Sequence, residues 1–372
     1  MKKCIGIVFA SLLCSFFSSA SCHAKEPIHI GLSIPMTGQF SDYGRDIKEG
    51  VELGLKWIND AGGIGGHPIE LIVGDSEGSS KKSKRLARKF TADKRIVAEI
   101  GDFSSSCSMA AQPIYQRAGM VQFSPTSSHP SFTSASTFSF SVSGTSEGQN
   151  IAIARMVAEK LHKKKIAVLY LNNDWGVVEQ NFFVEEAKRL GADIVALEGY
   201  LKGTTDFTAI LRKLRSSDPE LLYLCSLYSS GALISKQRQQ LGWNNVAVMG
   251  AGPLHSQKLL EVGGDAVENL YTSTSFFTKS ARLEVRKFVN GYEKRYNRTP
   301  NLFAAQSYDT INLLAEAIRQ GGTGRRAIRD ELAKIRDFSG AIGKISFSQY
   351  GDIIKEYLLL QVKNGEFVLC QP

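Results

Sequence analysis

Cysteine and histidine are scarce in this chain, and their spacing argues against the sites that they usually build. There are six residues of each type among 372. The histidines stand singly, without metal-ligand spacing, so we expect no metal. Only Cys107, Cys225 and Cys370 follow residue 24, and none lies in a CxxC pattern. An odd number excludes a fully paired disulfide framework, although one incidental pair stays open. We therefore interpret the three cysteines as buried residues that pack like small apolar side chains.

Long apolar runs are missing after residue 24. No later stretch approaches the roughly 20 apolar residues that a membrane helix needs. The one long run, Ile5 to Ala20, follows a basic start and precedes small residues and a polar segment. This arrangement is typical of a secretion signal cut after Ala24. We therefore predict a signal peptide over residues 1–24 and a periplasmic location. Lipid attachment at Cys22 is an alternative, which the missing large aliphatic residue before it disfavours.

A basic surface suited to nucleic acid is also lacking. The formal charge of +9 falls to +7 once Lys2 and Lys3 leave with the signal. Basic runs such as Lys163 to Lys165 have acids nearby and no accompanying aromatic platform. Solvated helix faces explain them, so we expect no nucleic-acid partner.

What the mature chain does contain is a repeated alternation of apolar strand-like runs and amphipathic helices. It begins with a strand at Ile28 to Ile34 and a helix at Asp46 to Asp60, and it continues to Phe123. A polar stretch from Ser124 to Ser146 interrupts this rhythm, which then resumes. The pattern predicts an α/β fold with two Rossmann-like lobes, parallel central sheets and a hinge. Ligands bind in the clefts of such folds.

We place the lobe boundaries at the interruptions of this rhythm. Residues 25–146 and 276–355 form the expected N-terminal lobe, which is discontinuous in sequence. Residues 147–275 and 356–372 form the expected C-terminal lobe.

Two motifs suggest chemistry that their surroundings do not support. The glycine run from Gly62 to Gly66 follows a helix and precedes a strand, whereas a phosphate-binding loop follows a strand. We therefore predict no cofactor. The run Gly144 to Gly148 matches the G-x-S-x-G pattern of hydrolases around Ser146, but the preceding strand is half polar. We interpret Ser146 as a helix N-cap, with a secreted hydrolase that uses His162 or His255 as the rival.

Two serine clusters follow neighbouring strands. One runs from Gly101 to Ser106 and the other from Ser124 to Ser128. Both lie at carboxyl ends of strands, where backbone N–H groups and hydroxyls at a helix start can hold a carboxylate. Ordinary helix capping and turn chemistry explain such clusters equally well.

With their surroundings, these clusters resemble the leucine/isoleucine/valine-binding family of periplasmic binding proteins, which have the type I fold. The resemblance covers nearly the whole mature chain. Its pieces are Gly31 to Gly38, Tyr43-Gly44, Gly62 to Gly66, Ser104-Ser105, Ser124-Pro125, Asn173 to Gly176, Thr205 to Phe207, Tyr308-Asp309 and Gln361 to Gly365.

The resemblance implies a binding protein and no enzyme. Such a protein takes up an amino acid or related small carboxylate by hinge closure and passes it to an ABC permease in the inner membrane. We expect a monomer. A rival role within the same fold is to present the ligand to a receptor or kinase.

The resemblance also implies the ligand-binding residues. Ser105, the backbone of Ser127, and Ser128 match positions that hold an α-carboxylate. Tyr43 matches an aromatic that walls the side-chain pocket. Trp175 and Tyr228 match aromatics with which the second lobe closes.

One departure concerns the ligand's ammonium group. Amino-acid binders commonly place a glutamate in the second lobe, at about the position of Gly252, and no acid stands there. A buried ammonium without a charged partner costs several kcal/mol. Trp175 also replaces the more usual tyrosine, which enlarges the apolar surface. An aromatic or aliphatic carboxylate, or an amide, is therefore an alternative to an amino acid.

Overall fold

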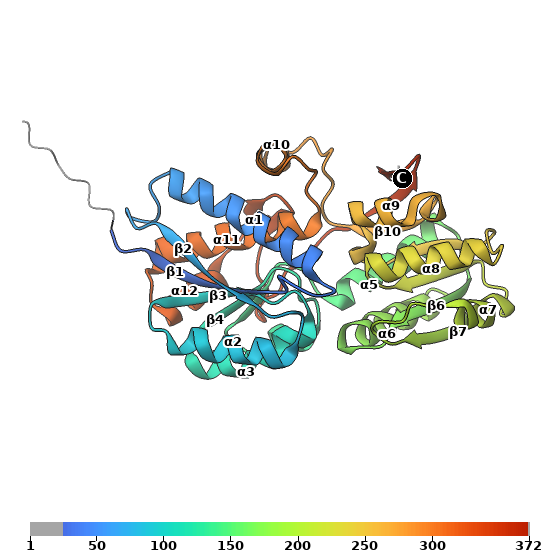
Figure 1. Ribbon diagram of the computed structural model, residues 1–372, viewed down its shortest axis with the longest axis horizontal. Coiled ribbons are helices and arrows are strands. Elements are labelled where there is room, and N and C mark those ends of the chain that lie inside the picture. The colour runs from blue at the N-terminus through green and yellow to red at the C-terminus, as the bar shows by residue number, and fades with distance from the viewer. Residues whose placement is uncertain (1–24, 371–372) are drawn as a thin grey trace, which may run out of the picture.

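The computed structural model describes residues 25–370, which form two α/β lobes side by side (Figure 1). We call them the first lobe, which contains the N-terminal strands, and the second lobe. The predicted signal peptide and Cys22 lie outside the described residues. Within residues 25–370, no helix combines the length and apolar character needed to cross a membrane.

The first lobe is built on a parallel five-stranded sheet in the order β2-β1-β3-β4-β5. Its central strands β3 and β4 are buried throughout, and β1 is buried except at His29, because helices cover both faces of the sheet, as the apolar runs predicted. The elements are β1 (Ile28–Ile34), α1 (Ser41–Asp60), β2 (Ile69–Asp75), α2 (Ser80–Ala92), β3 (Ile96–Gly101), α3 (Ser105–Ala118), β4 (Val121–Ser124), α4 (Pro130–Ser134) and β5 (Ser139–Ser141).

A C-terminal part of the chain completes the first lobe. Helix α11 (Leu302–Gly321) lies beside α1, although the two are far apart in sequence (Figure 1). The buried Asp309 of α11 accepts hydrogen bonds from the backbone N–H groups of Ala341 and Ile342, at 2.8 and 2.9 Å. It thereby fixes the turn of a small hairpin. The remaining elements are α10 (Leu283–Tyr296), α12 (Arg325–Lys334), β11 (Phe338–Gly340) and β12 (Gly343–Ile345).

The second lobe contains a seven-stranded sheet in the order β14-β13-β10-β9-β8-β6-β7. The five strands β6, β7, β8, β9 and β10 are parallel, whereas β13 and β14 are antiparallel additions at one edge of the sheet. The expectation of parallel sheets therefore holds for the centre of this lobe. The strands are β6 (Lys165–Leu171), β7 (Asp193–Tyr200), β8 (Leu221–Cys225), β9 (Ala247–Gly250), β10 (Tyr271–Thr274), β13 (Leu358–Lys363) and β14 (Glu366–Leu369).

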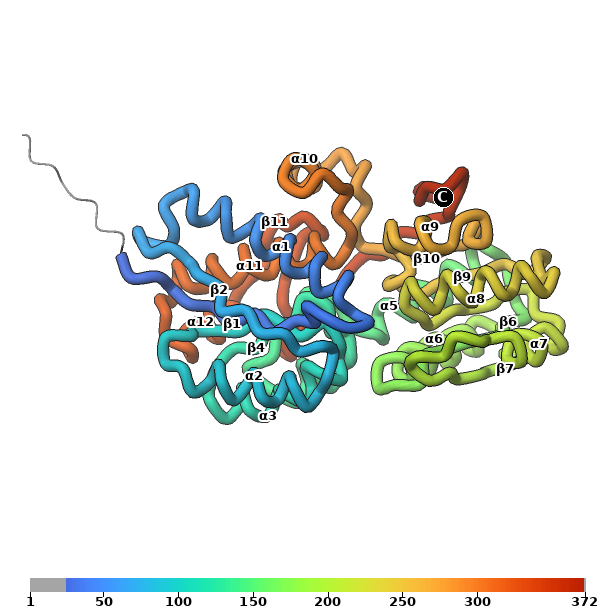
Figure 2. Tube along the Cα trace, viewed as in Figure 1, coloured from blue at the N-terminus to red at the C-terminus, as the bar shows by residue number. Residues whose placement is uncertain are grey.

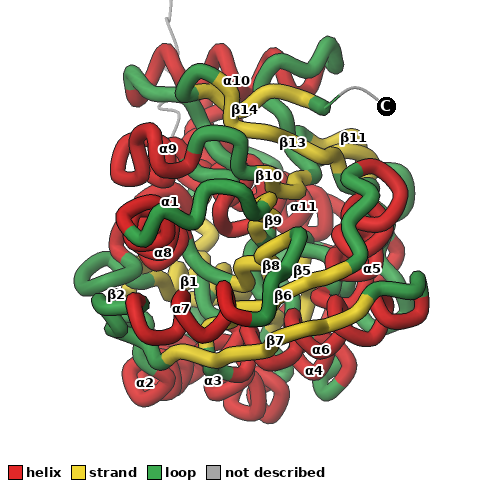
Figure 3. The backbone as a smooth tube through the Cα atoms, turned by 90° about the vertical axis from the view of Figure 1, so that its right-hand side faces the viewer, coloured by secondary structure: helices red, strands yellow, loops and turns green. Residues whose placement is uncertain are grey.

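Helices cover both faces of this second sheet. Figure 3 shows α8 and α9 on one face and α5 on the other. The α helices are α5 (Ser146–Arg155), α6 (Asp174–Arg189), α7 (Thr208–Ser216), α8 (Tyr228–Gln240) and α9 (Gln257–Gly263). Shorter helices of other types are the π-helix η1 (Met156–Lys160) and the 3-10 helices η2 (Gly252–Leu254) and η3 (Gly264–Val267).

The chain passes between the lobes in three places, before α5, after β10 and before β13 (Figure 2). These crossings lie close to the boundaries expected from the sequence, at residues 146, 275 and 356. We therefore propose those boundaries as the limits of the two lobes.

Two glycines of the family-like motifs allow helices to begin close to the ends of strands. A Cβ on Gly44 would lie 1.8 Å from the carbonyl oxygen of Pro35, and one on Gly176 would lie 1.9 Å from that of Leu171. Asn173 caps α6 by accepting a hydrogen bond from the Gly176 N–H at 2.8 Å. The motif from Asn173 to Gly176 thus sets where α6, and with it Trp175, begins.

The three cysteines in the described residues are unpaired. Cys107 and Cys225 are buried, whereas Cys370 is partly exposed. The first two occupy core positions, as expected of small apolar residues.

Candidate functional site

Two small adjoining cavities lie between the lobes. The first has a volume of about 50 Å³ and the second of about 40 Å³. They share a wall formed by Thr126 and Phe303 of the first lobe and by Trp175 and Pro253 of the second. Both lobes therefore contribute to one site, as expected for a cleft in this fold.

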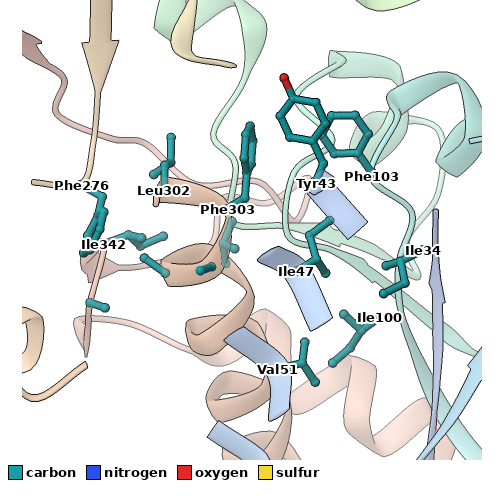
Figure 4. Packing of buried hydrophobic residues seen from close by; sticks show 14 of the residues in the cluster. Ile34, Tyr43, Ile47, Val51, Ile100, Phe103, Phe276, Leu302, Phe303 and Ile342 are labelled. Atoms are coloured by element: carbon teal, nitrogen blue, oxygen red, sulfur yellow. The ribbon is translucent and has the colours of Figure 1, made fainter. Parts of the chain in front are cut away.

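The first cavity is mainly apolar. Phe40, Phe103 and Phe303 line it from the first lobe, and Leu171 and Leu227 line it from the second. Figure 4 shows the rings of Tyr43 and Phe103 stacked beside Phe303. Such a wall favours a flat apolar ligand body over a strongly hydrated one.

The start of α3 forms the polar corner of the first cavity. Ser104 and Ser105 line it, and Ser105 is 3% exposed. Ser104 is the N-cap residue, but its side chain makes no capping hydrogen bond. The first N–H groups of a helix lack partners within the helix, and the helix dipole favours an anion there. This corner is therefore suited to a carboxylate.

Ser128 lines the second cavity together with Gln149, Gly252, Gln306 and Tyr357. Its hydroxyl lies 3.2 Å from a carboxyl oxygen of Glu179 and 3.1 Å from the hydroxyl of Ser146. This places the side chain between the cavity and a buried acid of the second lobe.

Three of the expected ligand-binding residues, Ser105, Ser128 and Trp175, line the cavities. The other three, Tyr43, Ser127 and Tyr228, lie near the cavities but do not line them. Tyr43 is 2% exposed and stacks on Phe103, with ring centroids 4.4 Å apart. It supports the aromatic wall from behind, and burial raises the pKa of its hydroxyl well above the usual value.

Tyr228 connects the lobes at the rim of the cleft. Its backbone N–H donates to the Tyr43 hydroxyl at 3.0 Å, and its own hydroxyl bonds the Asp42 carboxylate. Nearby, the Lys202 ammonium lies 4.2 Å from the ring centre of Phe40. These contacts hold the two lobes against each other.

The backbone of Ser127 is occupied within the first lobe. Its N–H donates to the Ser124 hydroxyl at 2.9 Å, and its carbonyl accepts from the Ser141 hydroxyl at 2.7 Å. The expected contact between this backbone and a ligand stays a prediction, and it requires the N–H to exchange its partner.

No carboxylate lines either cavity among the described residues. At the position expected for an acid, Gly252 forms part of the wall, and a Cβ there would lie 2.4 Å from the Gln149 amide nitrogen. The side chain of Gln149 thus fills space that a larger residue at 252 would need.

Ser146 has a different role from the one expected. Thr145, and not Ser146, is the N-cap of α5, because its side chain accepts from the Gly148 N–H at 3.1 Å. The helix begins at Ser146 itself, one residue earlier than an N-cap at Ser146 would require. Ser146 is fully buried, with its hydroxyl 2.5 Å from Glu179, while His255 contacts Thr274 instead. This geometry lacks the serine–histidine pair of a hydrolase.

Glu179 is the residue that the sequence analysis missed. It is fully buried and receives hydrogen bonds from Ser128, Ser146 and Asn150. A signal existed, because α6 buries Gly176, Glu179, Gln180 and Phe183, and helical spacing puts an acid on that face. Burial raises the pKa of Glu179 to about 7, against the lowering effect of its hydrogen bonds.

Groups of three or more histidine, cysteine, aspartate or glutamate side chains placed to hold a metal ion do not occur between residues 25 and 370.

Comparison with known proteins identifies relatives over most of the chain. The periplasmic binding protein family matches residues 27–366. The leucine-, isoleucine-, valine-, threonine- and alanine-binding protein of Pseudomonas aeruginosa is 25% identical over 351 residues, which cover 93% of this chain and 92% of that protein.

Solved structures agree with this assignment. The branched-chain amino acid binding protein LivJ of Streptococcus pneumoniae, in complex with isoleucine, has a TM-score of 0.87 and 26% identity, covering 93% of this chain and all of that one (100%). A solute-binding protein from R. palustris in complex with benzoate has a TM-score of 0.85 and 20% identity, and the match covers 92% of this chain and 95% of that one. Their architecture is the type I fold of two α/β lobes. This chain therefore belongs to the periplasmic binding protein family, whose members bind solutes and are not enzymes.

Proposed function

We propose that this protein is the periplasmic solute-binding component of an ABC importer and that its ligand is a small carboxylate with an apolar, preferably aromatic, body. The observation that carries the proposal is the start of α3, where Ser105 meets a cavity walled by Phe103, Phe303 and Trp175. A carboxylate on this helix start would place its apolar body against those rings.

The absence of an acidic lining among the described residues favours this ligand class over an amino acid. An α-ammonium buried here would lose hydration without gaining a directly opposed carboxylate. The fold itself accommodates both classes, since the S. pneumoniae protein holds isoleucine and the R. palustris protein holds benzoate. The choice between them therefore rests on the cavity lining of this chain.

We propose hinge closure as the mechanism. The ligand docks on Ser105 and Ser128 of the first lobe, and the second lobe then covers it with Trp175 and Pro253. Contacts from both lobes exist only in the closed form, so the ligand stabilises that form by its differential affinity. The permease would recognise the surfaces that closure brings together. Permease and ATPase genes beside this gene would support transport, and signalling genes would favour the sensory role.

An amino acid is the second candidate, and one observation favours it. Glu179 lies behind Ser128, so a ligand ammonium that donates to the Ser128 hydroxyl would gain from that charge. Ser128 separates Glu179 from the cavity, so Glu179 would stabilise a bound ammonium less than a carboxylate in direct contact with it would.

A thermal-shift screen tests the proposal. Benzoate, L-leucine and benzamide share an apolar body but differ in charge at the polar end. At 100 times its dissociation constant, a ligand stabilises the folded protein by about 2.7 kcal/mol. We expect benzoate to raise the melting temperature and benzamide to have little effect. Stabilisation by L-leucine without stabilisation by benzoate would assign the amino-acid function instead.

A further inference from the structure

Glu179 is a buried carboxyl group that the proposed function does not use. It lies on α6 in the second lobe, with one oxygen 3.2 Å from the hydroxyl of Ser128 in the first lobe and 2.5 Å from that of Ser146. Its other oxygen bonds the amide of Asn150, whose own carbonyl oxygen accepts from the Tyr223 hydroxyl at 2.6 Å. The amide orientation is thereby fixed, with its nitrogen toward Glu179.

The hydroxyl of Ser128 has one hydrogen and two lone pairs. When Glu179 is ionised, it can only accept, so Ser128 and Ser146 both direct their hydrogens to it. Ser128 then offers only lone pairs to the second cavity, which repel a ligand carboxylate. When Glu179 is protonated, it donates to one of the two serine oxygens. The hydrogen of Ser128 then becomes free to point into the cavity.

We propose that Glu179 is a positioning residue that couples carboxylate binding to proton uptake: the protonated acid frees the Ser128 hydroxyl to donate to the ligand. The proton comes from solvent and is retained on Glu179 in the complex, and no covalent bond is made or broken. This inference rests on the proposed function, because it requires a carboxylate at Ser128.

The titratable groups that face Glu179 directly do not change charge near pH 7. Tyr223 and Cys225 face it from β8, and Tyr357 faces it from the segment before β13. Burial raises the pKa of all three, so they are neutral near pH 7.

Most charged residues on neighbouring elements are exposed or paired, and burial lowers the pKa of the His129 imidazole, which follows Ser128, so that it is neutral near pH 7. On α6 itself, Asp174 is exposed at the helix start and Glu186 pairs with Arg189. On the other elements packed against α6, two charged residues are paired: Arg155 of α5 with Glu186, and Glu198 of β7 with Lys213. The remaining charged residues there are exposed, namely Glu147 of α5, Arg117 of α3, Lys165 of β6 and Asp193 of β7.

The direction of the pH effect follows from proton uptake. Burial, the largest influence, places the pKa of Glu179 at about 7, so the free protein is partly protonated at neutral pH. A bound carboxylate selects the protonated form and raises that pKa further. Affinity should therefore be constant at low pH and fall by up to about tenfold per pH unit above about pH 7.

Calorimetric titration with benzoate, from about pH 5.5 to about pH 8.5, tests this coupling. Measurements in two buffers of different ionisation enthalpy give the number of protons taken up. We expect fractional uptake near pH 7, rising toward one proton at higher pH. In the Glu179→Gln variant the amide mimics the protonated acid, so affinity should become independent of pH and match that of the unchanged protein at low pH.

Two further variants complete the test. Glu185→Gln removes an exposed acid from the same helix and should keep the pH dependence. Ser128→Ala should weaken binding at low pH and abolish the dependence even if Glu179→Gln fails to fold. Benzoate affinity that is constant or rises with pH in the unchanged protein would overturn the coupling alone. Failure to bind benzoate at any pH would instead overturn the proposed ligand class, and the coupling with it.

Discussion

The two lobes present different chemistry to the site between them. The first lobe supplies the start of α3, the hydroxyls of Ser105 and Ser128, and three phenylalanine rings. The second lobe supplies Trp175, Pro253 and two leucines, with the amides of Asn173 and Gln149 as its main polar groups.

This asymmetry separates affinity for the ligand's charged end from affinity for its body. Of the groups that line the cavities, the start of α3 in the first lobe is the corner to which we assign the ligand's carboxylate. The second lobe contributes mostly apolar cover, and its buried acid, Glu179, acts through a serine of the first lobe. The lobes therefore divide recognition, with charge recognised on one side and apolar shape on the other.

Trp175→Ala should have the largest effect among single changes in the second lobe. The indole lines both cavities, so its removal takes away the main apolar cover. Truncation of a buried aromatic anchor costs about 2–4 kcal/mol, which corresponds to a loss of benzoate affinity of roughly 30- to 1,000-fold. Calorimetry would measure this loss. Trp175→Phe should restore most of the affinity, and equal losses in both variants would contradict a role as apolar cover.

Gly252→Glu should reverse the charge preference of the second lobe. It places an acid where amino-acid binders commonly have one, and the clash with Gln149 involves the end of a flexible side chain. We expect benzoate affinity to fall by about 10-fold or more and L-leucine affinity to rise, because the new charge opposes a carboxylate and pairs an ammonium. Gly252→Gln is the uncharged control. Equal behaviour of the two variants would show that volume, and not charge, governs this position.

Tyr228→Phe should have the smallest effect. It keeps the ring and the backbone contact to Tyr43 but removes the hydrogen bond to Asp42 across the rim. A hydrogen bond present only in the closed form contributes about 1 kcal/mol, so benzoate affinity should fall by roughly fivefold. Tyr350→Phe, at an exposed tyrosine, should leave affinity unchanged. An unchanged affinity in Tyr228→Phe would mean that this contact does not stabilise closure.

Much of the fold followed from the sequence because most central strands and helices have clear hydrophobic periodicity. The predicted strand from Ile28 to Ile34 is β1, and the predicted helix from Asp46 to Asp60 lies within α1, which begins at Ser41. Short elements were missed, including α4, α9 and β14, because four to seven residues carry too little periodicity. The antiparallel edge of the second sheet depends on where the chain returns after its last crossing, which local pattern does not encode.

The site was predictable only in part. Ser105 and Trp175 lie at positions that motifs fix, because each follows a strand end at a helix start. The inward position of Tyr43 depends on stacking with Phe103, and that of Ser127 on bonds to Ser124 and Ser141. Such contacts join distant segments, so no local spacing reveals them. The cluster at Glu179 likewise arises from three separate parts of the chain.

The central claim is that the first lobe holds a ligand carboxylate, and titration of benzoate into a Ser105→Ala, Ser128→Ala double variant tests it most directly. Hydrogen bonds to a charged group contribute about 1.5–3 kcal/mol each, so loss of both hydroxyls should weaken binding by at least about 100-fold. Ser339→Ala, at an exposed serine of the same lobe, is the matched control and should bind like the unchanged protein. Unchanged benzoate affinity in a correctly folded double variant would contradict the account.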